Sequence, residues 1–246
     1  MKILKTKDKL EKNYTVKDKL SNLPARILIV GKSALSGKTN LLVNLLCRDG
    51  PDFYNNDFNQ GSNIYLVSSS IGIDDKLDKL INFKDIPDEN LLLKFNEDNL
   101  TEIYDEIQNK FKLAIEEKRK ENYLLILDDC SYNGDLKSKK NGIINKIASN
   151  GRHINLSIIV TAQKYSDLLT SLRENMTMGI FFACSNKQLD LISEDVNYYA
   201  DNKDFKRAFR DATSEMHSFF VVNFFRPISE MYLNSRFEVI KLKKKD

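Results

Sequence analysis

Gly37, Lys38 and Thr39 stand in the order and at the spacing of a loop that binds phosphate groups. They follow a short apolar run at 26–30 and begin a segment in which leucines recur at helical spacing. A strand, a loop and a helix in this order direct backbone N–H groups at a phosphate. In such a loop Lys38 would contact the β- and γ-phosphates of a nucleotide, and the Thr39 hydroxyl would bind Mg²⁺. An ordinary strand–turn–helix with a chance Gly-Lys-Thr is the alternative, and the flanking elements favour the phosphate loop.

The loop departs from the common pattern G-x-x-x-x-G-K-[ST]. That pattern places its first glycine at position 32, which is Lys32, whereas the glycine of this chain is Gly31. Ala34 and Leu35 occupy the loop centre, where other small residues are usual. Either the loop carries one extra residue, or Lys32 takes the first position. The expected nucleotide-contacting residues are Gly31, Lys32, Ser33, Ala34, Leu35, Ser36, Gly37, Lys38, Thr39 and Asn40.

Two carboxylates follow another apolar run. The run at 123–127 is continuous and ends at Asp128 and Asp129. The carboxyl ends of buried parallel strands lie at the ligand crevice of a sheet, where charges are costly unless a cation or a reaction uses them. Together with the phosphate loop, the pair is typical of a Walker B element. Asp128 would then hold Mg²⁺ and Asp129 would polarise the attacking water, whereas a pair of solvated loop acids is the alternative.

A polar side chain ends the next apolar run as well. The run at 156–162 leads directly into Gln163. A glutamine at this place can sense the γ-phosphate or the attacking water, and it can also simply cap a loop. The acid pair at the end of the preceding run favours the role of a sensor.

The composition of the 246 residues limits the classes of protein that fit. Hydrophobic residues make up 41% and charged residues 30%, which is typical of a globular domain with a substantial core. A net charge of +3 permits a nucleic-acid partner without arguing for one. Three separated cysteines and two histidines give no zinc or disulfide framework. The charged N-terminus lacks a signal-peptide core and no apolar run reaches membrane-spanning length, so we expect a protein that is neither secreted nor membrane-spanning.

Strands and helices alternate along the middle of the chain. Apolar runs predict strands at 26–30, 63–68, 91–95, 123–127, 156–163 and 179–184, and further strand-like runs at 219–225, 231–234 and 237–240. Helices are expected at 99–120, 139–149, 166–172, 187–195 and 203–212. In the longest of these, the apolar positions at helical spacing are Leu100, Ile103, Ile107, Phe111 and Ile115. This order predicts an α/β fold with a mostly parallel central sheet, helices on both faces and an antiparallel edge near the C-terminus.

The expected organisation is one main domain with short terminal segments. Residues 1–23 form a polar, lysine-rich entry segment, 24–240 the P-loop ATPase domain, and 241–246 a basic tail. A second lysine-rich stretch contains Lys137, Lys139, Lys140 and Lys146. In a ring-shaped motor these lysines could contact phosphates, and a solvated loop explains them equally well.

Four elements stand in a characteristic order. They are the phosphate loop, the strand end at 67–70 followed by Asp74-Asp75, the acid pair, and Gly151-Arg152-His153 leading to Gln163 and 173–175. This ordered set resembles the genome-packaging ATPases of large DNA viruses of the poxvirus type and of virophages. Those proteins belong to the FtsK–HerA superfamily of DNA-pumping P-loop motors. The resemblance covers roughly residues 20 to 235.

The resemblance implies a RecA-like fold in which an extra strand separates the Walker A and Walker B strands. It implies ATP and Mg²⁺ as cofactors, and a homo-oligomeric ring (a pentamer or hexamer) around double-stranded DNA with ATP at the subunit interfaces. Hydrolysis would drive DNA into a preformed capsid, so viral capsid or portal-vertex proteins are expected partners. The host cytoplasm (the viral factory), and also the virion, are the implied locations.

The resemblance also implies roles for single residues. By position, Lys38 and Thr39 would bind phosphate and Mg²⁺, and Gln163 would be the polar sensor. Asp128 and Asp129 would form the acid pair, where the superfamily often has Asp-Glu. An arginine supplied by a neighbouring subunit is expected as well, with Arg173 as first candidate and Arg152 as second. A surface ion pair is the alternative for each arginine.

Other functions remain open at this point. The enlarged loop could bind nucleotide without hydrolysing it efficiently, which would leave a DNA- or capsid-binding adaptor. The retained Lys38, Thr39 and acid pair argue against that reading. The chain could also be an FtsK–HerA-type DNA motor that is not dedicated to packaging. A small-molecule kinase would need an arginine-rich lid, and the sequence shows none.

Overall fold

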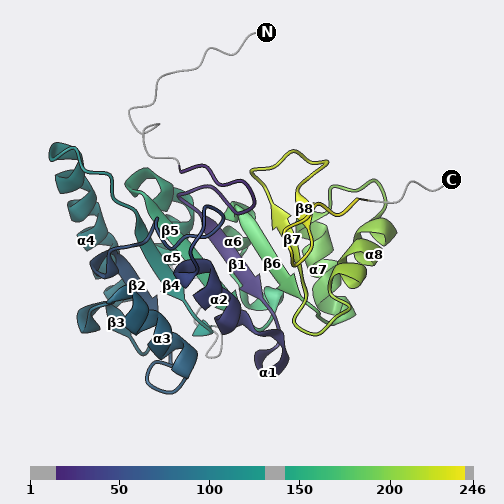
Figure 1. Cartoon of the computed structure of the whole chain (residues 1–246), viewed down its shortest axis with the longest axis horizontal. Helices are drawn as coiled ribbons and strands as arrows, with labels where there is room; N and C mark the ends of the chain where they lie inside the picture. The colour runs from purple at the N-terminus through teal and green to yellow at the C-terminus, as the bar shows by residue number, and fades with distance from the viewer. Residues whose placement is uncertain (1–14, 131–141, 242–246) are drawn as a thin grey trace, which may run out of the picture.

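The computed structural model describes residues 15–130 and 142–241. Within them an eight-stranded sheet has the order β3-β2-β4-β5-β1-β6-β7-β8 (Figure 1). The strands are β1 (Arg26–Val30), β2 (Ile64–Val67), β3 (Leu91–Leu92), β4 (Tyr123–Leu127), β5 (Leu156–Ala162), β6 (Met178–Phe182), β7 (Phe219–Asn223) and β8 (Tyr232–Leu233). The pairings from β3 to β6 are parallel, and β6–β7 and β7–β8 are antiparallel. The predicted mostly parallel sheet with an antiparallel C-terminal edge is confirmed.

Strand β5 lies between β1 and β4, so one strand separates the phosphate loop from the acid pair, as the resemblance implied. Val30 at the end of β1 pairs with Ala162, and Leu127 at the end of β4 pairs with Val160. The residues that follow these three parallel strands therefore leave the sheet at the same edge. This register brings the loop, the acid pair and Gln163 to one place.

Helices cover both faces of the sheet, as predicted. They are α1 (Ser33–Ser36), α2 (Lys38–Cys47), α3 (Asp75–Lys84), α4 (Glu97–Glu116), α5 (Gly142–Asn150), α6 (Thr170–Asn175), α7 (Asn186–Val196) and α8 (Asn202–Ala212). One core contains Leu28 and Val30 of β1 together with buried side chains of α4, α5, α7 and α8. The other contains Ile27 and Ile29 together with α2 and α3. Successive side chains of β1 thus lie in two different hydrophobic layers, one on each face of the sheet.

Helix α4 agrees with the predicted segment except at its end. Leu100, Ile103, Ile107 and Phe111 are buried as expected, but Ile115 is 52% exposed. The expectation for Ile115 was wrong because the buried stripe continues through Ala114, the residue one position earlier. No described helix is long and apolar enough to cross a membrane.

The helix predicted at 166–172 was wrong in its position. A short 3-10 turn covers Tyr165–Asp167, and α6 begins only at Thr170 and runs to Asn175. Leu168 and Leu169 are extended between them and pack into the core, which interrupts the helical hydrogen bonding. Arg173 consequently lies inside a helix and not after one.

Several other boundaries shift. Strand β3 has two residues, β6 ends before Ala183, and the run at 237–240 contributes only an isolated bridge between Leu233 and Val239. The second described part of the chain begins with α5 at Gly142. The predicted helical positions 139–141 and the lysines at 137, 139 and 140 therefore lie outside the described residues. Lys146 places its ammonium 4.3 Å from the centre of the Tyr104 ring.

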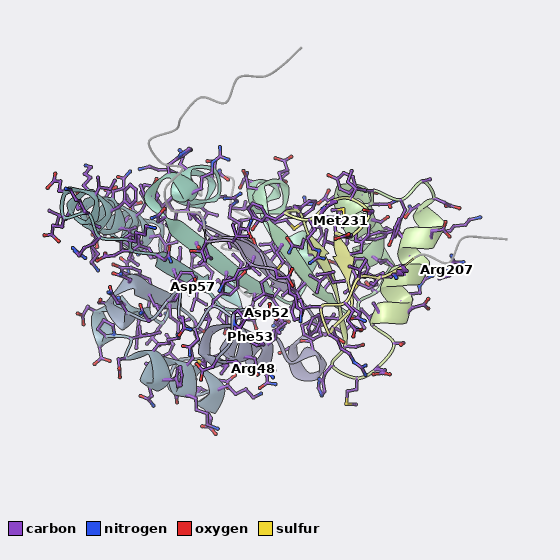
Figure 2. The ribbon with its side chains drawn as sticks, turned by 45° about the horizontal axis from the view of Figure 1, so that its top comes forward. Arg48, Asp52, Phe53, Asp57, Arg207 and Met231 are labelled. Atoms are coloured by element: carbon purple, nitrogen blue, oxygen red, sulfur yellow. The ribbon has the colours of Figure 1, made fainter. Side chains whose placement is uncertain are left out.

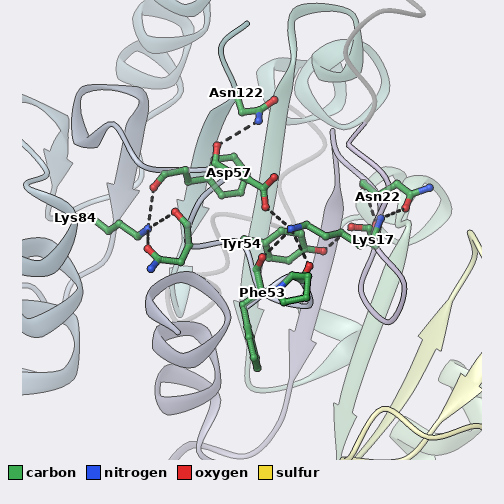
Figure 3. Close-up of polar contacts among 11 residues, drawn as sticks. Lys17, Asn22, Phe53, Tyr54, Asp57, Lys84 and Asn122 are labelled. Carbon is green, nitrogen blue, oxygen red and sulfur yellow. Dashed lines mark hydrogen bonds and ion pairs between the residues drawn. The ribbon is translucent and has the colours of Figure 1, made fainter. Parts of the chain in front are cut away.

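The described part of the entry segment is packed onto the domain. Lys17 forms an ion pair of 2.6 Å with Asp57, and its ammonium donates to the Phe53 carbonyl at 2.8 Å (Figure 3). The Tyr54 hydroxyl donates to the Ser21 carbonyl at 2.7 Å. Leu20 and Leu23 are buried in the same core as α2 and α3. Residues 15–23 therefore fix the connection that follows α2, which forms one wall of a cavity beside the phosphate loop.

Candidate nucleotide-binding site

The phosphate loop contains an additional helical turn. Helix α1 fills its middle, Gly37 has the left-handed φ of 83° between the two helices, and α2 begins at Lys38. A methyl group on Gly31 would lie 2.7 Å from Cβ of Ser36 and 2.9 Å from Phe182, which is closer than carbon atoms pack. Gly31 thus provides the close backbone approach that the first glycine of such a loop needs. Five residues separate Gly31 from Gly37, and four of them form α1.

Lys38 lies inside this loop. The residue is buried, and its Nζ donates to the Gly31 carbonyl at 2.8 Å. Burial lowers the pKa of the Lys38 ammonium, while the nearby Asp129 and Asp128 carboxylates act in the opposite direction. A cation that is fixed between the loop and two acids is positioned to bind phosphate oxygens at this edge of the sheet.

Asp128 is held by hydroxyl groups of both neighbouring strands. Its Oδ1 accepts from Thr161 at 2.7 Å and its Oδ2 from Ser68 at 3.1 Å. Burial is the largest influence on the Asp128 carboxyl and raises its pKa in spite of these two hydrogen bonds. Thr161 was missed in the sequence, and Ser68 was noted only as part of the strand end at 67–70, without a role. A hydroxyl residue near the carboxyl end of an apolar strand is the signal that could have identified both.

Asp129 adopts a backbone conformation that few residues tolerate. Its φ is 52°, in the left-handed region where Asp and Asn are enriched. The backbone N–H donates to Thr161 at 2.9 Å, and Oδ2 accepts from Nε2 of Gln163 at 2.9 Å. Oδ1 is buried without a hydrogen-bond partner among the described residues. Because a buried carboxylate oxygen normally accepts hydrogen bonds, Oδ1 is available for a water molecule.

The residues fit a magnesium ion that is shared with a nucleotide. Thr39 is half-buried at the start of α2, and Asp128 offers a carboxylate at the same edge of the sheet. The described residues contain no group of three or more acidic, histidine or cysteine side chains that could bind a metal alone. Mg²⁺ typically binds one or two protein oxygens and completes its shell with phosphate and water.

The two candidate arginines lie in different surroundings. Arg173 donates to Asp195 at 2.6 Å, and its guanidinium lies 5.2 Å from the centre of the Tyr165 ring. Arg152 is exposed in the 3-10 turn before β5 and has no polar partner among the described residues. Neither contacts the phosphate loop of its own chain. Arg173 is occupied inside the subunit, whereas Arg152 is accessible to a neighbour.

Three of the cavities that the described residues form adjoin the loop. The largest, about 740 Å³, begins at Gly37 and Asn40 and extends to Phe53 and Phe237. A cavity of about 330 Å³ lies between Lys32 and the segment at 213–218. The third, about 420 Å³, contains Gln163 in its wall. The site therefore has open space on both sides of the phosphate loop.

We expect Asp128→Asn to raise the thermal stability of the nucleotide-free protein and to remove Mg²⁺-dependent hydrolysis. The raised pKa means that the stability contributed by this carboxyl is present below its unfolded pKa and is lost as the pH rises through its folded pKa. Asparagine keeps the shape of the side chain without the buried charge. The melting temperature of the variant should therefore be a few degrees above that of the wild type at neutral pH. Thermal unfolding across a pH series measures this difference.

Asp105→Asn is the matched control, because Asp105 is exposed on α4. Its melting temperature should follow that of the wild type at every pH. A lower melting temperature of Asp128→Asn at neutral pH would contradict the argument that burial of the charge dominates at this position.

A family model and several solved structures are similar to this chain. A family model described as Poxvirus A32 protein matches residues 11–223. The crystal structure of B204, the DNA-packaging ATPase from Sulfolobus turreted icosahedral virus, is similar with a TM-score of 0.55 and 16% identity, over 82% of this chain and 93% of that chain. The genome packaging NTPase B204 from Sulfolobus turreted icosahedral virus 2 in complex with AMPPCP is similar with a TM-score of 0.53 and 17% identity, over 81% of this chain and 92% of that chain. No curated protein sequence matches the chain.

A bacterial protein shares the fold over a smaller part of its length. ATPases 2 and 3 of EssC from Geobacillus thermodenitrificans give a TM-score of 0.50 and 14% identity, over 72% of this chain and 35% of that chain. At such identities the solved structures establish the P-loop NTPase fold. The family model establishes more, because it spans the phosphate loop, the acid pair and Gln163. The chain belongs to the family of the poxvirus A32 protein.

Proposed function

We propose that this protein is an ATP-driven translocase of double-stranded DNA that packages a viral genome into a preformed capsid. The observation that carries the proposal is the joining of Lys38, Asp129 and Gln163 at one edge of the sheet, with Oδ1 of Asp129 buried and unpaired among the described residues. A nucleotide-binding adaptor would have no use for a carboxylate oxygen that is buried beside the phosphate loop without a partner in the described part of the chain. Family membership supports packaging as the task, because B204, which shares the fold, is a DNA-packaging ATPase.

The acids determine which way the nucleotide lies. Asp129 and Gln163 mark the γ-phosphate end, so the base points to the opposite side of the loop. The cavity of about 740 Å³ lies on that side, and its wall includes Phe53, Phe219 and Phe237. Aromatic rings of this kind stack with a purine. Figure 2 shows Phe53 close to Arg48, whose guanidinium lies 4.9 Å from the centre of the ring.

Backbone strain gathers around the same cavity. His217 and Phe237 both line it and have positive φ values of 64° and 59°, which are uncommon for residues other than glycine and most of all for a bulky residue such as Phe. Such conformations persist where the surroundings enforce them, and they cluster at binding sites. The strain supports this cavity as the place of the base.

The chain's own groups account for the hydrolytic step. Asp129 Oδ1 accepts a hydrogen bond from water and orients the water oxygen towards the γ-phosphorus, while Gln163 fixes the carboxylate through Oδ2. The new bond joins the water oxygen to phosphorus, and the water proton passes to the Asp129 carboxylate. The bond between phosphorus and the bridging oxygen breaks, and its electron pair stays on the β-phosphate of the leaving ADP. Lys38 neutralises charge on the β- and γ-phosphates during this change. When bound, Mg²⁺ held by Thr39 and Asp128 would screen the same phosphate charge.

A ring of subunits completes the proposed motor. Neither Arg152 nor Arg173 contacts the loop of its own chain, so each of these two would act on the ATP of a neighbour in a pentamer or hexamer. We assign this role to Arg152, because Arg173 is held by Asp195 and Tyr165 of its own chain. Capsid or portal-vertex proteins would be further partners, and the viral factory in the host cytoplasm would be the place of action.

Displacement of a third DNA strand tests translocation directly. The purified protein is mixed with a linear duplex that carries a triplex-forming oligonucleotide at one end, and the release of the labelled strand is followed. ATP should release the strand in the wild type, and AMPPCP should not. If the protein hydrolysed ATP and bound duplex DNA but never displaced the strand, translocation would be contradicted. The protein would then be an ATPase with a different function.

A further inference from the structure

A basic cavity lies beside the hydrolytic site. Its volume is about 420 Å³, and three of its lining residues are Lys32, Lys164 and Lys187. Lys32 and Lys164 each stand two residues after the end of a strand, β1 and β5, and Lys187 lies in the first turn of α7 after β6. Because β5, β1 and β6 are neighbours in the sheet, the three lysines form a row across its carboxyl edge.

The cavity has the chemistry of a phosphate site. Of its charged lining residues three are lysines and one is an acid, Asp167, so its formal charge is three minus one, or +2. All three lysines are exposed, and none forms an ion pair with another described residue. The remaining wall offers hydroxyl and amide groups, among them Ser33, and no side chain caps the adjacent amino end of α7. Such donors and cations together bind phosphate oxygens.

We propose that this cavity binds a backbone phosphate of double-stranded DNA. The inference rests on the proposed translocase function and adds the site through which DNA acts on hydrolysis. Inorganic phosphate released from ATP has the same chemistry. The DNA backbone fits better because the lysines are exposed in a row over three strands, which suits a polyanion that passes along the surface.

Gln163 connects this cavity to the hydrolytic site. Gln163 lines the cavity, and its Nε2 donates to Oδ2 of Asp129 at 2.9 Å. Lys164 is the next residue along the chain. A phosphate bound by Lys164 therefore lies directly beside the group that fixes the acid, so DNA binding here should change the hydrolysis rate.

The double variant Lys164→Ala/Lys187→Ala tests the site in the full-length protein. Duplex DNA binding is measured over a series of salt concentrations, together with ATP hydrolysis with and without DNA. The control is Lys112→Ala/Lys120→Ala, which removes two exposed cations at the end of the molecule where α4 lies (Figure 1). We expect the test variant to bind DNA about 10-fold more weakly at low salt, and its log–log salt slope to decrease by about 1 to 2. Stimulation of hydrolysis by DNA should be lost, while the rate without DNA stays within about twofold of the wild type.

Two results would overturn the inference. DNA affinity and salt slope equal to those of the control would show that the lysines do not contact DNA. In the second result, the test variant binds DNA like the wild type but hydrolyses ATP more slowly without DNA. If enzymatic removal of inorganic phosphate relieved this defect, the cavity would be assigned to released phosphate. A wild-type protein that does not bind duplex DNA would overturn the proposed function as well, so the two failures are distinguishable.

Discussion

Lys38→Ala should reduce Mg²⁺-dependent ATP hydrolysis by about 10³ or more, to the level of the background. The ammonium is fixed inside the loop by the Gly31 carbonyl and lies close enough to Asp128 and Asp129 for their charges to act on it. No other described cation occupies the interior of the loop, so nothing can replace its attraction to the β- and γ-phosphates. Removal of one such group from a preorganised site typically costs about 10²–10³ in rate, and loss of nucleotide affinity adds to this. Steady-state phosphate release measures the effect.

The control for this variant is Lys112→Ala on the exposed face of α4, which should hydrolyse ATP at the wild-type rate. Thermal unfolding of Lys38→Ala should show a single cooperative transition, because the residue packs at the loop and outside the two hydrophobic cores. A folded Lys38→Ala protein that retained a tenth of the wild-type rate would show that the loop is not the phosphate site.

Arg152→Ala should lower hydrolysis by about 10³ in the assembled oligomer, the magnitude typical of an arginine supplied in trans. Arg152 is exposed and free of polar partners among the described residues, so a neighbouring subunit can receive it without a change of fold. The defect should be shared across interfaces. Mixing Arg152→Ala with Lys38→Ala should restore hydrolysis at those interfaces where an intact loop meets an intact arginine.

Arg173→Ala is the matched comparison. Its ion pair with Asp195 and its contact with Tyr165 predict a loss of stability, with hydrolysis preserved in the molecules that remain folded. If Arg173→Ala stopped hydrolysis without changing the melting temperature, and Arg152→Ala did not, the two assignments would have to be exchanged.

The sequence predicted the parts of this molecule that depend on local pattern. Mostly apolar runs identified β1, β4 and β5, because strands buried on both faces are rich in apolar residues. The structure brings the residues directly after those runs together in the candidate site, since parallel strands deliver their carboxyl ends to one edge. The predicted proximity of the loop and the acid pair depended on this arrangement of parallel strands.

Tertiary packing decided what the sequence could not show. Arg173 and Asp195 pair across 22 positions of sequence, so the local sequence gave no sign of this ion pair and Arg173 was ranked before Arg152. Leu168 and Leu169 favour a helix by propensity, yet core packing holds them extended and moves α6 towards the C-terminus. Thr161 looked like an ordinary residue of an apolar strand until the structure placed its hydroxyl between Asp128 and Asp129.

The central claim is that ATP hydrolysis by this site is coupled to duplex DNA. The most direct measurement is steady-state ATP and GTP hydrolysis by the oligomeric fraction, with and without long double-stranded DNA, beside Lys38→Ala as the blank. We predict ATP hydrolysis above the blank that increases several-fold when duplex DNA is added. An oligomer that hydrolyses no faster than Lys38→Ala under both conditions would contradict the account.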